Sequence, residues 1–152
     1  MSLTVVIGPP AAGKTTWVRE RAGPRDIVID YDVLAVALAG TGAHTHRHPQ
    51  TLKQVAWAAR RAALREALKH TATTNVYVVH THPAPHDMAA YRRDGATIVG
   101  PDPGRDVVTR RCQAERTRGH LSAVGRWYAA KERGDFAEAR APAQPTGASR
   151  KW

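Results

Sequence analysis

The sequence predicts a three-layer α/β fold with a mostly parallel sheet of four or five strands. Short β-branched apolar runs, which are typical of buried parallel strands, alternate along the chain with helical patterns. A chain of 152 residues with 42% hydrophobic residues is also long enough to bury one core. We place a single domain at residues 1–136. We expect residues 137–152 to form a flexible tail, because this segment is rich in Ala, Pro and Gly.

The first apolar run, residues 3–7, leads directly into a glycine-rich loop. Residues 8–15 match the pattern G-x-x-x-x-G-K-[ST] at every fixed position, and residues 16–22 continue as a helix. The backbone N–H groups of such a loop wrap a phosphate, and the helix directs its positive N-terminus at the same anion. Lys14 adds a charge for the β- and γ-phosphates, and the hydroxyl of Thr15 is a magnesium ligand.

The pattern is that of the phosphate-binding loop, or P-loop, and it predicts ATP and Mg²⁺ as cofactors. The alternative interpretation is an ordinary strand–loop–helix corner. The predicted nucleotide contacts follow one another along the loop and the first turn of the helix: Gly8, Pro9, Pro10, Ala11, Ala12, Gly13, Lys14, Thr15 and Thr16.

The overall charge is strongly positive, with 23 Lys and Arg against 13 Asp and Glu and a formal net charge of +10. Such a field favours anionic partners, either nucleotides or nucleic acid, and the charge alone does not separate the two. A single cysteine, Cys112, excludes an internal disulfide and suits a reducing compartment. We find no apolar run of membrane-spanning length and no signal peptide before the first strand. We therefore expect a soluble cytoplasmic protein without a membrane partner.

Two carboxylates follow the second predicted strand, residues 26–30. Asp30 and Asp32 lie where parallel α/β sheets place their ligands, just past the C-terminal end of a strand. We expect one of them to face the magnesium and the phosphates, and the other to face an acceptor hydroxyl. The alternative is that they only cap the helix predicted at residues 33–38, for which Asp32 is well placed.

Residues 43–49 form a histidine-rich loop between Gly and Pro residues. Its three histidines, at positions 44, 46 and 48, alternate with other residues, but no Cys or acidic residue is near to complete a zinc site. We expect a mobile loop over the substrate cleft, with zinc binding as the alternative.

The longest helical pattern runs from residue 50 to residue 70. Along one side it has a basic stripe that is either a solvated face or a track for a phosphodiester backbone: Arg61, Arg65 and Lys69. On the other side it has an apolar stripe that suits close packing on a sheet: Leu52, Val55, Ala56, Ala59, Ala63 and Ala67.

The third strand is predicted at residues 75–80, where many P-loop proteins end the strand with an acidic residue. Here the strand ends with His80, so Asp30 and Asp32 remain the plausible carboxylates. His82, two residues later, contacts substrate in one interpretation and fills the turn in the other. A helix at residues 85–93 and a fourth strand at residues 96–100 complete this part of the pattern.

The last part of the domain is predicted to be helical and rich in arginine. Residues 105–118 contain five arginines, and we interpret them as part of a lid at about residues 103–120 that reaches over the transferred phosphoryl group. The alternative is a basic surface helix. A final helix at residues 121–133 has Trp127 and Tyr128 to anchor it on the core.

This order of motifs resembles the small P-loop kinases. The nearest types are the 5′-hydroxyl polynucleotide kinases, followed by zeta-toxin-like and antibiotic phosphotransferases. The chain looks most like the compact stand-alone members, known as AAA-family ATPases, of actinobacteria and their phages. The segments Arg126-Trp127-Tyr128 and His80-Thr81-His82-Pro83 fit this resemblance, which covers residues 3–133. Only the P-loop within it is highly specific.

The resemblance implies that Lys14 and Thr15 bind ATP and magnesium, and that a carboxylate after the second strand is the general base. Asp32 fits the position of this base best. In polynucleotide kinases an Arg follows the base by three residues and binds the phosphate of the acceptor, but Ala35 stands there in this chain. Arg47 and Arg61 are candidates to replace that arginine.

The resemblance also suggests roles for the lid arginines. Arg111 and Arg116 match the spaced pair of the family, and Arg110 and Arg118 are the next candidates. The predicted site residues therefore fall into three groups. The catalytic group is Lys14, Asp32, Arg111 and Arg116. Arg110 joins the nucleotide contacts, and the substrate contacts are Asp30, Arg47 and His82.

We interpret the chain as an ATP-dependent phosphotransferase that moves the γ-phosphate to a hydroxyl. The preferred acceptor is a nucleic-acid 5′-hydroxyl or a nucleoside or nucleotide hydroxyl. The alternatives are a small-molecule kinase acting on an antibiotic or sugar-nucleotide hydroxyl, and a P-loop ATPase or nucleic-acid-binding module without transfer activity.

Overall fold

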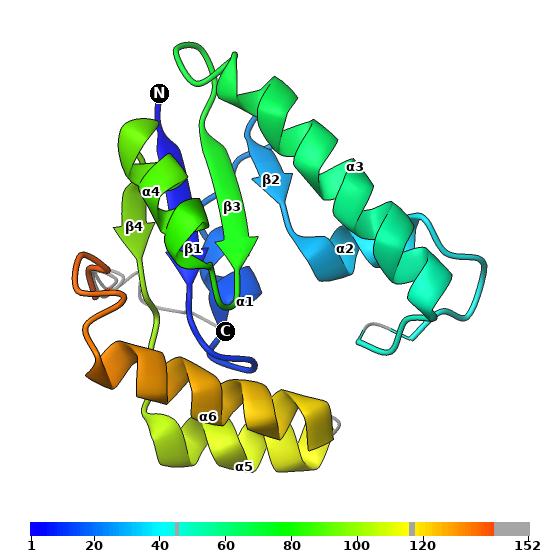
Figure 1. The fold of residues 1–152 in the computed structure, drawn as a ribbon. Coiled ribbons are helices and arrows are strands. Elements are labelled where there is room, and N and C mark those ends of the chain that lie inside the picture. The colour runs from blue at the N-terminus through cyan, green and yellow to red at the C-terminus, as the bar shows by residue number, and fades with distance from the viewer. Residues whose placement is uncertain (45, 116–117, 142–152) are drawn as a thin grey trace, which may run out of the picture.

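A computed structural model describes residues 1–44, 46–115 and 118–141 of the chain. In this part of the chain, four strands form one sheet, in the order β2-β3-β1-β4, and every pairing is parallel (Figure 1). The prediction of a parallel α/β sheet with four or five strands is confirmed. The strands are β1 (Leu3–Ile7), β2 (Ile27–Ile29), β3 (Val76–His80) and β4 (Thr97–Val99).

Helices cover both faces of the sheet and give the three predicted layers. On one face, Val18 of α1 packs with Val6 and Val79 in a small apolar cluster. On the other face, α3 and α4 pack with the larger core, which includes Val5 and Val78. These two residues precede Val6 and Val79 in the strands, and successive strand residues point to opposite faces of a sheet. The helices are α1 (Lys14–Arg19), α2 (Tyr31–Ala37), α3 (Gln50–Leu68), α4 (Pro85–Arg93), α5 (Arg105–Glu115) and α6 (Arg118–Glu132).

The register of the sheet brings the C-terminal ends of the strands together at one edge. Ile7 at the end of β1 is paired with His80 at the end of β3, and Ile29 of β2 is paired with Val78 of β3. The P-loop, the residues after β2 and the residues after β3 therefore leave the sheet side by side. This edge is where an open parallel sheet places its ligands.

Helix α3 differs from the predicted pattern at one buried position. Ala56 and Ala67 of the predicted stripe are buried, but Val55 is 55% exposed, so Val55 does not belong to the packed face. The buried position one turn after Ala56 is occupied by Arg60, which is 4% exposed. The helix thus places a cation, rather than a further apolar residue, in the direction of the sheet.

Helices α5 and α6 form a hairpin that lies across the C-terminal edge of the sheet (Figure 1). The hairpin is anchored by Val108, Cys112 and Trp127, which are all buried. The Cys112 thiol lies 3.7 Å from the carbonyl oxygen of Pro10 in the P-loop. The helix predicted at residues 105–118 ends at Glu115, and the final helix begins at Arg118 rather than at residue 121.

The first residues of the predicted tail are part of the fold. The backbone N–H of Arg140 donates to the carbonyl of Ile98 at 3.0 Å, and the N–H of Gly100 donates to the carbonyl of Arg140 at 2.9 Å. Phe136, which is 7% exposed, joins the core just before this segment. In the structure Arg140, within the segment predicted as a tail, thus pairs with the outer strand of the sheet, while residues 142–152 lie outside the described part.

None of the helices in the described ranges combines the length and the apolar composition that crossing a bilayer requires.

Candidate active site

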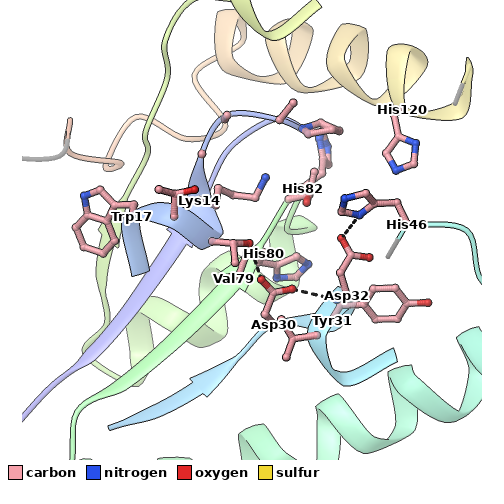
Figure 2. Close-up of a pocket in the computed structure, with 18 of the residues that line it drawn as sticks. Lys14, Trp17, Asp30, Tyr31, Asp32, His46, Val79, His80, His82 and His120 are labelled. Atoms are coloured by element: carbon pink, nitrogen blue, oxygen red, sulfur yellow. Dashed lines mark hydrogen bonds and ion pairs between the residues drawn. The ribbon is translucent and has the colours of Figure 1, made fainter. Parts of the chain in front are cut away.

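A cavity of about 1080 Å³ opens at the C-terminal edge of the sheet. The P-loop and α1 form one wall, and the residues after β2 and β3 form its floor (Figure 2). The histidine loop and α3 form a further wall, and Arg111 of α5 and His120 of α6 close the side toward the helical hairpin. The cavity thus collects side chains from segments that are far apart in the sequence.

The backbone of the P-loop has the turned geometry that its sequence predicts. Gly13, the N-cap of α1, has a φ of 88°, in the left-handed region that glycine adopts without strain. A Cβ at Gly8 would lie 3.1 Å from the carbonyl oxygen of Pro101, so a side chain there would force the loop away from the β4–α5 connection. Ala11 has a φ of 60°, a conformation that costs a non-glycine residue about 1–2 kcal/mol.

Two cations are bonded to the carbonyl groups of this loop. The Lys14 ammonium donates to the carbonyls of Gly8 and Pro9 at 2.9 and 2.7 Å, and its side chain is buried. The Arg111 guanidinium donates to the carbonyl of Ala11 at 3.3 Å. The structure therefore brings a predicted lid arginine and the P-loop lysine to the same loop. Both are placed to neutralise a phosphate held there.

Asp30 connects the P-loop to the end of β2. The Thr15 hydroxyl donates to Asp30 Oδ2 at 2.7 Å, and the N–H of Asp32 donates to Asp30 Oδ1 at 3.0 Å. The N-cap of α2 is thus Asp30, and the expectation that Asp32 caps this helix is wrong. The helix begins at Tyr31, two residues earlier than predicted, so the carboxylate one position before it takes the cap.

The Thr15 and Asp30 oxygens are a suitable donor pair for Mg²⁺. The hydroxyl and the carboxylate are hard oxygen ligands that lie within hydrogen-bond distance of one another, and Asp30 is only 5% exposed. Mg²⁺ is usually held by one or two such side chains together with water and substrate phosphates. In the described ranges, no cluster of three or more His, Cys, Asp or Glu residues could hold a metal ion by itself.

Asp32 contacts the histidine loop at the cavity (Figure 2). His46 Nδ1 lies 3.0 Å from Asp32 Oδ2, and His48 Nε2 lies 3.6 Å from Asp32 Oδ1. The second distance is within the range of an ion pair but too long for a hydrogen bond. The His46 ring also lies 6.2 Å from the ring of His120 on α6. The loop predicted to cover the cleft is thus attached to one of the two predicted carboxylates.

Helix α3 contributes an aromatic side chain and a buried cation that the sequence analysis did not select. Trp57 is 43% exposed, and its ring centroid lies 4.8 Å from that of Tyr31 on α2. Arg60 donates to the carbonyl oxygen of Val79 at 3.3 Å. The sequence does contain a signal for Arg60. It lies one turn after Ala56, at a position of the helix that the apolar stripe predicts to be buried.

His80, at the end of β3, is neutral at physiological pH. Burial, and then the positive charge of Arg60, lower the pKa of His80 to about 4. Its Nδ1 lies 2.9 Å from the hydroxyl of Tyr91. A neutral, hydrogen-bonded histidine therefore takes the place where many P-loop proteins have an acidic residue, and it adds no negative charge beneath the phosphate site.

The structure brings most of the predicted site residues to this cavity, but not all. Arg47 and Arg110 are exposed and do not line it, and neither does Arg61. Gly8 and Pro9 of the P-loop do not line the cavity either, but their carbonyls accept hydrogen bonds from Lys14. Arg116 lies outside the described residues. The predicted residues that do line the cavity are Pro10, Ala11, Ala12, Gly13, Lys14, Thr15, Thr16, Asp30, Asp32, His82 and Arg111.

Residues 3–114 match the model of a protein family described as an AAA domain. Among solved structures, the chain is similar to one in "Structure of the Pnkp1/Rnl/Hen1 RNA repair complex". The TM-score is 0.64 at 16% sequence identity, and the match covers 97% of this chain and 50% of that one. For a second structure, of the Pnkp1/Rnl/Hen1 complex, the TM-score is 0.53 at 17% identity, with coverage of 73% and 38%.

A crystal structure of a "putative kinase" from Chloroflexus aurantiacus is also similar, with a TM-score of 0.56 and 19% identity over 81% of this chain and 74% of that one. At these identities the similarity is one of fold. The chain spans half or less of the chains that it matches in the two Pnkp1/Rnl/Hen1 structures. No curated protein matches the sequence.

Proposed function

Because the chain belongs to the AAA domain family, whose model matches residues 3–114, we propose that it is an ATP-dependent phosphotransferase that phosphorylates a hydroxyl group. The observation that supports this best is the position of the two carboxylates. Asp30 is bonded to the P-loop threonine, and Asp32 faces the same cavity from the start of α2. One is suited to the metal–phosphate side of the reaction, and the other to an incoming hydroxyl.

In the proposed reaction, the residues of the P-loop bind the phosphates of ATP. Backbone N–H groups and Lys14 hold the β- and γ-phosphates, and Arg111 neutralises the charge that spreads over the γ-phosphoryl oxygens during transfer. Thr15 and Asp30 would hold magnesium, which would neutralise part of the charge of the phosphates. The tight loop keeps these donors in place before the substrate arrives.

Asp32 is the proposed general base. Its carboxylate accepts the proton of the acceptor hydroxyl as the hydroxyl oxygen attacks the γ-phosphorus in line with the departing ADP. The contact with His46 orients the carboxylate, because one of its oxygens lies within hydrogen-bond distance of the imidazole. His46 approaches from the loop over the cavity, so the base is oriented only while this loop is in place.

For the acceptor, we propose a nucleic-acid 5′-hydroxyl or a related nucleoside hydroxyl. The cations that line the cavity support this proposal, because they exceed what the phosphates of ATP require: Lys14, Arg19, Lys53, Arg60 and Arg111. The similarity of the fold to a structure from an RNA repair complex also supports it.

One difference from the polynucleotide kinases favours a second candidate function, the phosphorylation of a smaller hydroxyl compound. Ala35 stands where the polynucleotide kinases have an acceptor-binding arginine, and it is fully buried in α2. The acceptor phosphate would therefore need another cation in this protein.

The test is to incubate the protein with radiolabelled ATP and separate pools of nucleosides, DNA 5′-ends, RNA 5′-ends, and antibiotics with free hydroxyls. We expect label on nucleic-acid or nucleoside hydroxyls. Label on the antibiotics alone would support the second candidate. Release of free phosphate with every pool, without transfer, would contradict the proposed phosphotransferase and favour an ATPase.

A further inference from the structure

We propose that the cavity wall formed by α2 and α3 binds a phosphorylated nucleoside, with its base stacked on Trp57 and its phosphate at Arg60. This inference rests on the function proposed above, because it identifies the acceptor of the same site. It replaces the residues that the sequence suggested for acceptor binding, since Arg47 and Arg61 do not line the cavity.

The first observation is the buried charge of Arg60. Its side chain lines the cavity and is 4% exposed, yet the hydrogen bonds given for it in the described part of the chain run to neutral groups, the carbonyl of Val79 and the side chain of Tyr91. Arg60 forms no ion pair with a carboxylate among the described residues. A buried cation without a counter-ion is costly, and an anion from a ligand would compensate it. The planar guanidinium suits a phosphate because it offers two parallel N–H donors.

The second observation is an exposed aromatic surface beside this charge. Trp57 and Tyr31 lie with their rings 4.8 Å apart and tilted by 32°, and the Arg60 guanidinium lies 5.4 Å from the Trp57 ring. Indole rings are usually buried, but Trp57 is 43% exposed on a helix that lines the cavity. Exposed aromatic rings next to cations are how proteins stack the bases of single-stranded nucleic acids.

Helix geometry places the contacts of this wall on one side of α3. Lys53, Trp57 and Arg60 are spaced by four and then three residues, so they lie on one face, and all three line the cavity. A ligand that bears an aromatic ring and an anionic group would contact all three. A neutral sugar or an antibiotic without an aromatic ring would offer the exposed part of the indole no ring to stack on.

His48 connects this wall to the proposed base. It is 8% exposed, and neither ring nitrogen has a hydrogen-bond partner among the described residues. Its ring lies 6.1 Å from that of Tyr31, and its Nε2 lies 3.6 Å from Asp32 Oδ1. A nucleoside on the wall would therefore offer a sugar hydroxyl beside Asp32. In the transfer, that oxygen bonds to the γ-phosphorus, its proton moves to Asp32, and the bond to the β-phosphate oxygen breaks to release ADP.

The base contact is tested with a short single-stranded oligonucleotide that has a free 5′-hydroxyl, and with the same oligonucleotide lacking its 5′-terminal base. For the wild type, removal of the base is expected to raise the acceptor KM by ~5–150-fold, the range of one base–aromatic stack. Trp57→Ala is expected to raise the KM for the intact oligonucleotide by a similar factor and to become insensitive to removal of the base. The KM for ATP stays unchanged in both experiments.

The control is Val55→Ala, which removes another exposed apolar side chain of α3 that does not line the cavity. It is expected to leave the acceptor KM unchanged. If Trp57→Ala phosphorylates both oligonucleotides with wild-type KM values, the base does not stack on this wall and the inference is overturned. If Trp57→Ala remains as sensitive to removal of the base as the wild type, the stack lies elsewhere.

The anion contact is tested with an oligonucleotide whose first linkage is an uncharged methylphosphonate. For the wild type, this substitution is expected to raise the acceptor KM by at least ~10-fold, because it removes the charge that compensates a buried guanidinium. Arg60→Gln is expected to lose this sensitivity, and its neighbour Arg61→Gln, which changes an exposed arginine, is expected to keep it. An Arg60→Gln variant that remains fully sensitive would overturn the assignment.

Two further measurements keep this test decisive. If Arg60→Gln fails to fold, the wild type with the uncharged oligonucleotide still reports whether the first phosphate matters, and equal KM values would overturn the anion site. If the wild type phosphorylates no acceptor, the proposed function fails. Calorimetric binding of an oligonucleotide with hydrogen in place of its 5′-hydroxyl then tests the wall alone. Binding that Trp57→Ala weakens supports the wall, and binding that it leaves unchanged overturns it.

Discussion

Asp30 has two separate contacts, and two substitutions at this position are expected to separate them. One carboxylate oxygen accepts the N–H of Asp32 at the N-cap of α2, and the other accepts the Thr15 hydroxyl at 2.7 Å. Asn keeps an oxygen for the cap but removes the negative charge. Ala removes both contacts. Asp30→Asn is therefore expected to impair magnesium use without much loss of stability, and Asp30→Ala is expected to impair both.

The magnitudes follow from the contacts. Loss of an N-cap side chain costs about 0.5–2 kcal/mol, and loss of the hydrogen bond from Thr15 adds about 1 kcal/mol. Asp30→Ala should thus lower the free energy of unfolding by about 1.5–3 kcal/mol, which is roughly 3–12 °C in Tm for a domain of this size. In Asp30→Asn the cap remains, and only the interaction with the helix dipole is lost, about 0.3–1 kcal/mol.

The assay combines thermal unfolding with a magnesium titration of phosphate transfer. We expect Asp30→Asn to raise the Mg²⁺ concentration for half-maximal activity by at least ~10-fold, because removal of even an outer partner of a metal ligand costs about 10–100-fold in affinity and Asp30 is itself a proposed ligand. Asp32→Asn is the matched control, since it changes the neighbouring carboxylate and should leave the Mg²⁺ requirement unchanged. If Asp30→Asn loses as much stability as Asp30→Ala, or keeps the wild-type Mg²⁺ requirement, the division of roles between the two oxygens is refuted.

Four further predictions follow from the same site. Lys14→Ala should abolish ATP binding by calorimetry while the far-ultraviolet circular dichroism stays unchanged, because the hydrogen bonds of its ammonium to the Gly8 and Pro9 carbonyls lie within the loop itself. Unchanged ATP affinity would contradict the role of the loop. Asp32→Asn should retain ATP affinity and lower the transfer rate by ~10²–10⁴, the range for a general base, and a wild-type rate would show that another group accepts the proton. Burial, with the charge of Arg60, lowers the pKa of His80 from 6.5 to about 4, so the unfolded chain binds a proton between these values and the folded chain does not. The free energy of unfolding should therefore fall by up to ~3 kcal/mol as the pH drops from 6.5 to 4. Urea titrations at several pH values should show a smaller fall for His80→Gln. If the variant loses as much stability as the wild type over this pH range, other groups cause the pH dependence. The acceptor KM should rise steeply with salt for long single-stranded oligonucleotides and much less for a dinucleotide, and a flat response for both would indicate a small-molecule acceptor.

The fold could be predicted because its signals are local in the sequence. The P-loop pattern lies between a β-branched run and a helix, and the structure has a strand and a helix at these places. The same holds for the helix Pro85–Arg93, which has the predicted bounds because a proline begins it and two arginines and a glycine end it. The resemblance to small P-loop kinases is confirmed at the level of family and fold.

The parts of the site that escaped prediction depend on contacts between distant segments. The sequence presented Asp30 and Asp32 as a pair, but only the start of α2 at Tyr31 determines which one caps the helix. Arg60 belongs to no motif, and its importance lies in the burial that the packing of α3 imposes. The histidine loop has no sequence signal for its contact with Asp32, because that contact depends on how the loop folds back over the cavity.

The pairing of Arg140 with β4 also matters for how the protein behaves at high concentration. β4 is an outer strand of the sheet, and Arg140 satisfies the N–H of Gly100 and the carbonyl of Ile98 at that strand. Outer strands with unpaired backbone groups are templates for edge-to-edge aggregation. A shortened version ending at residue 136 would leave these two groups unpaired at the outer strand. Any recombinant version intended for crystals or spectroscopy should therefore retain the chain through residue 141.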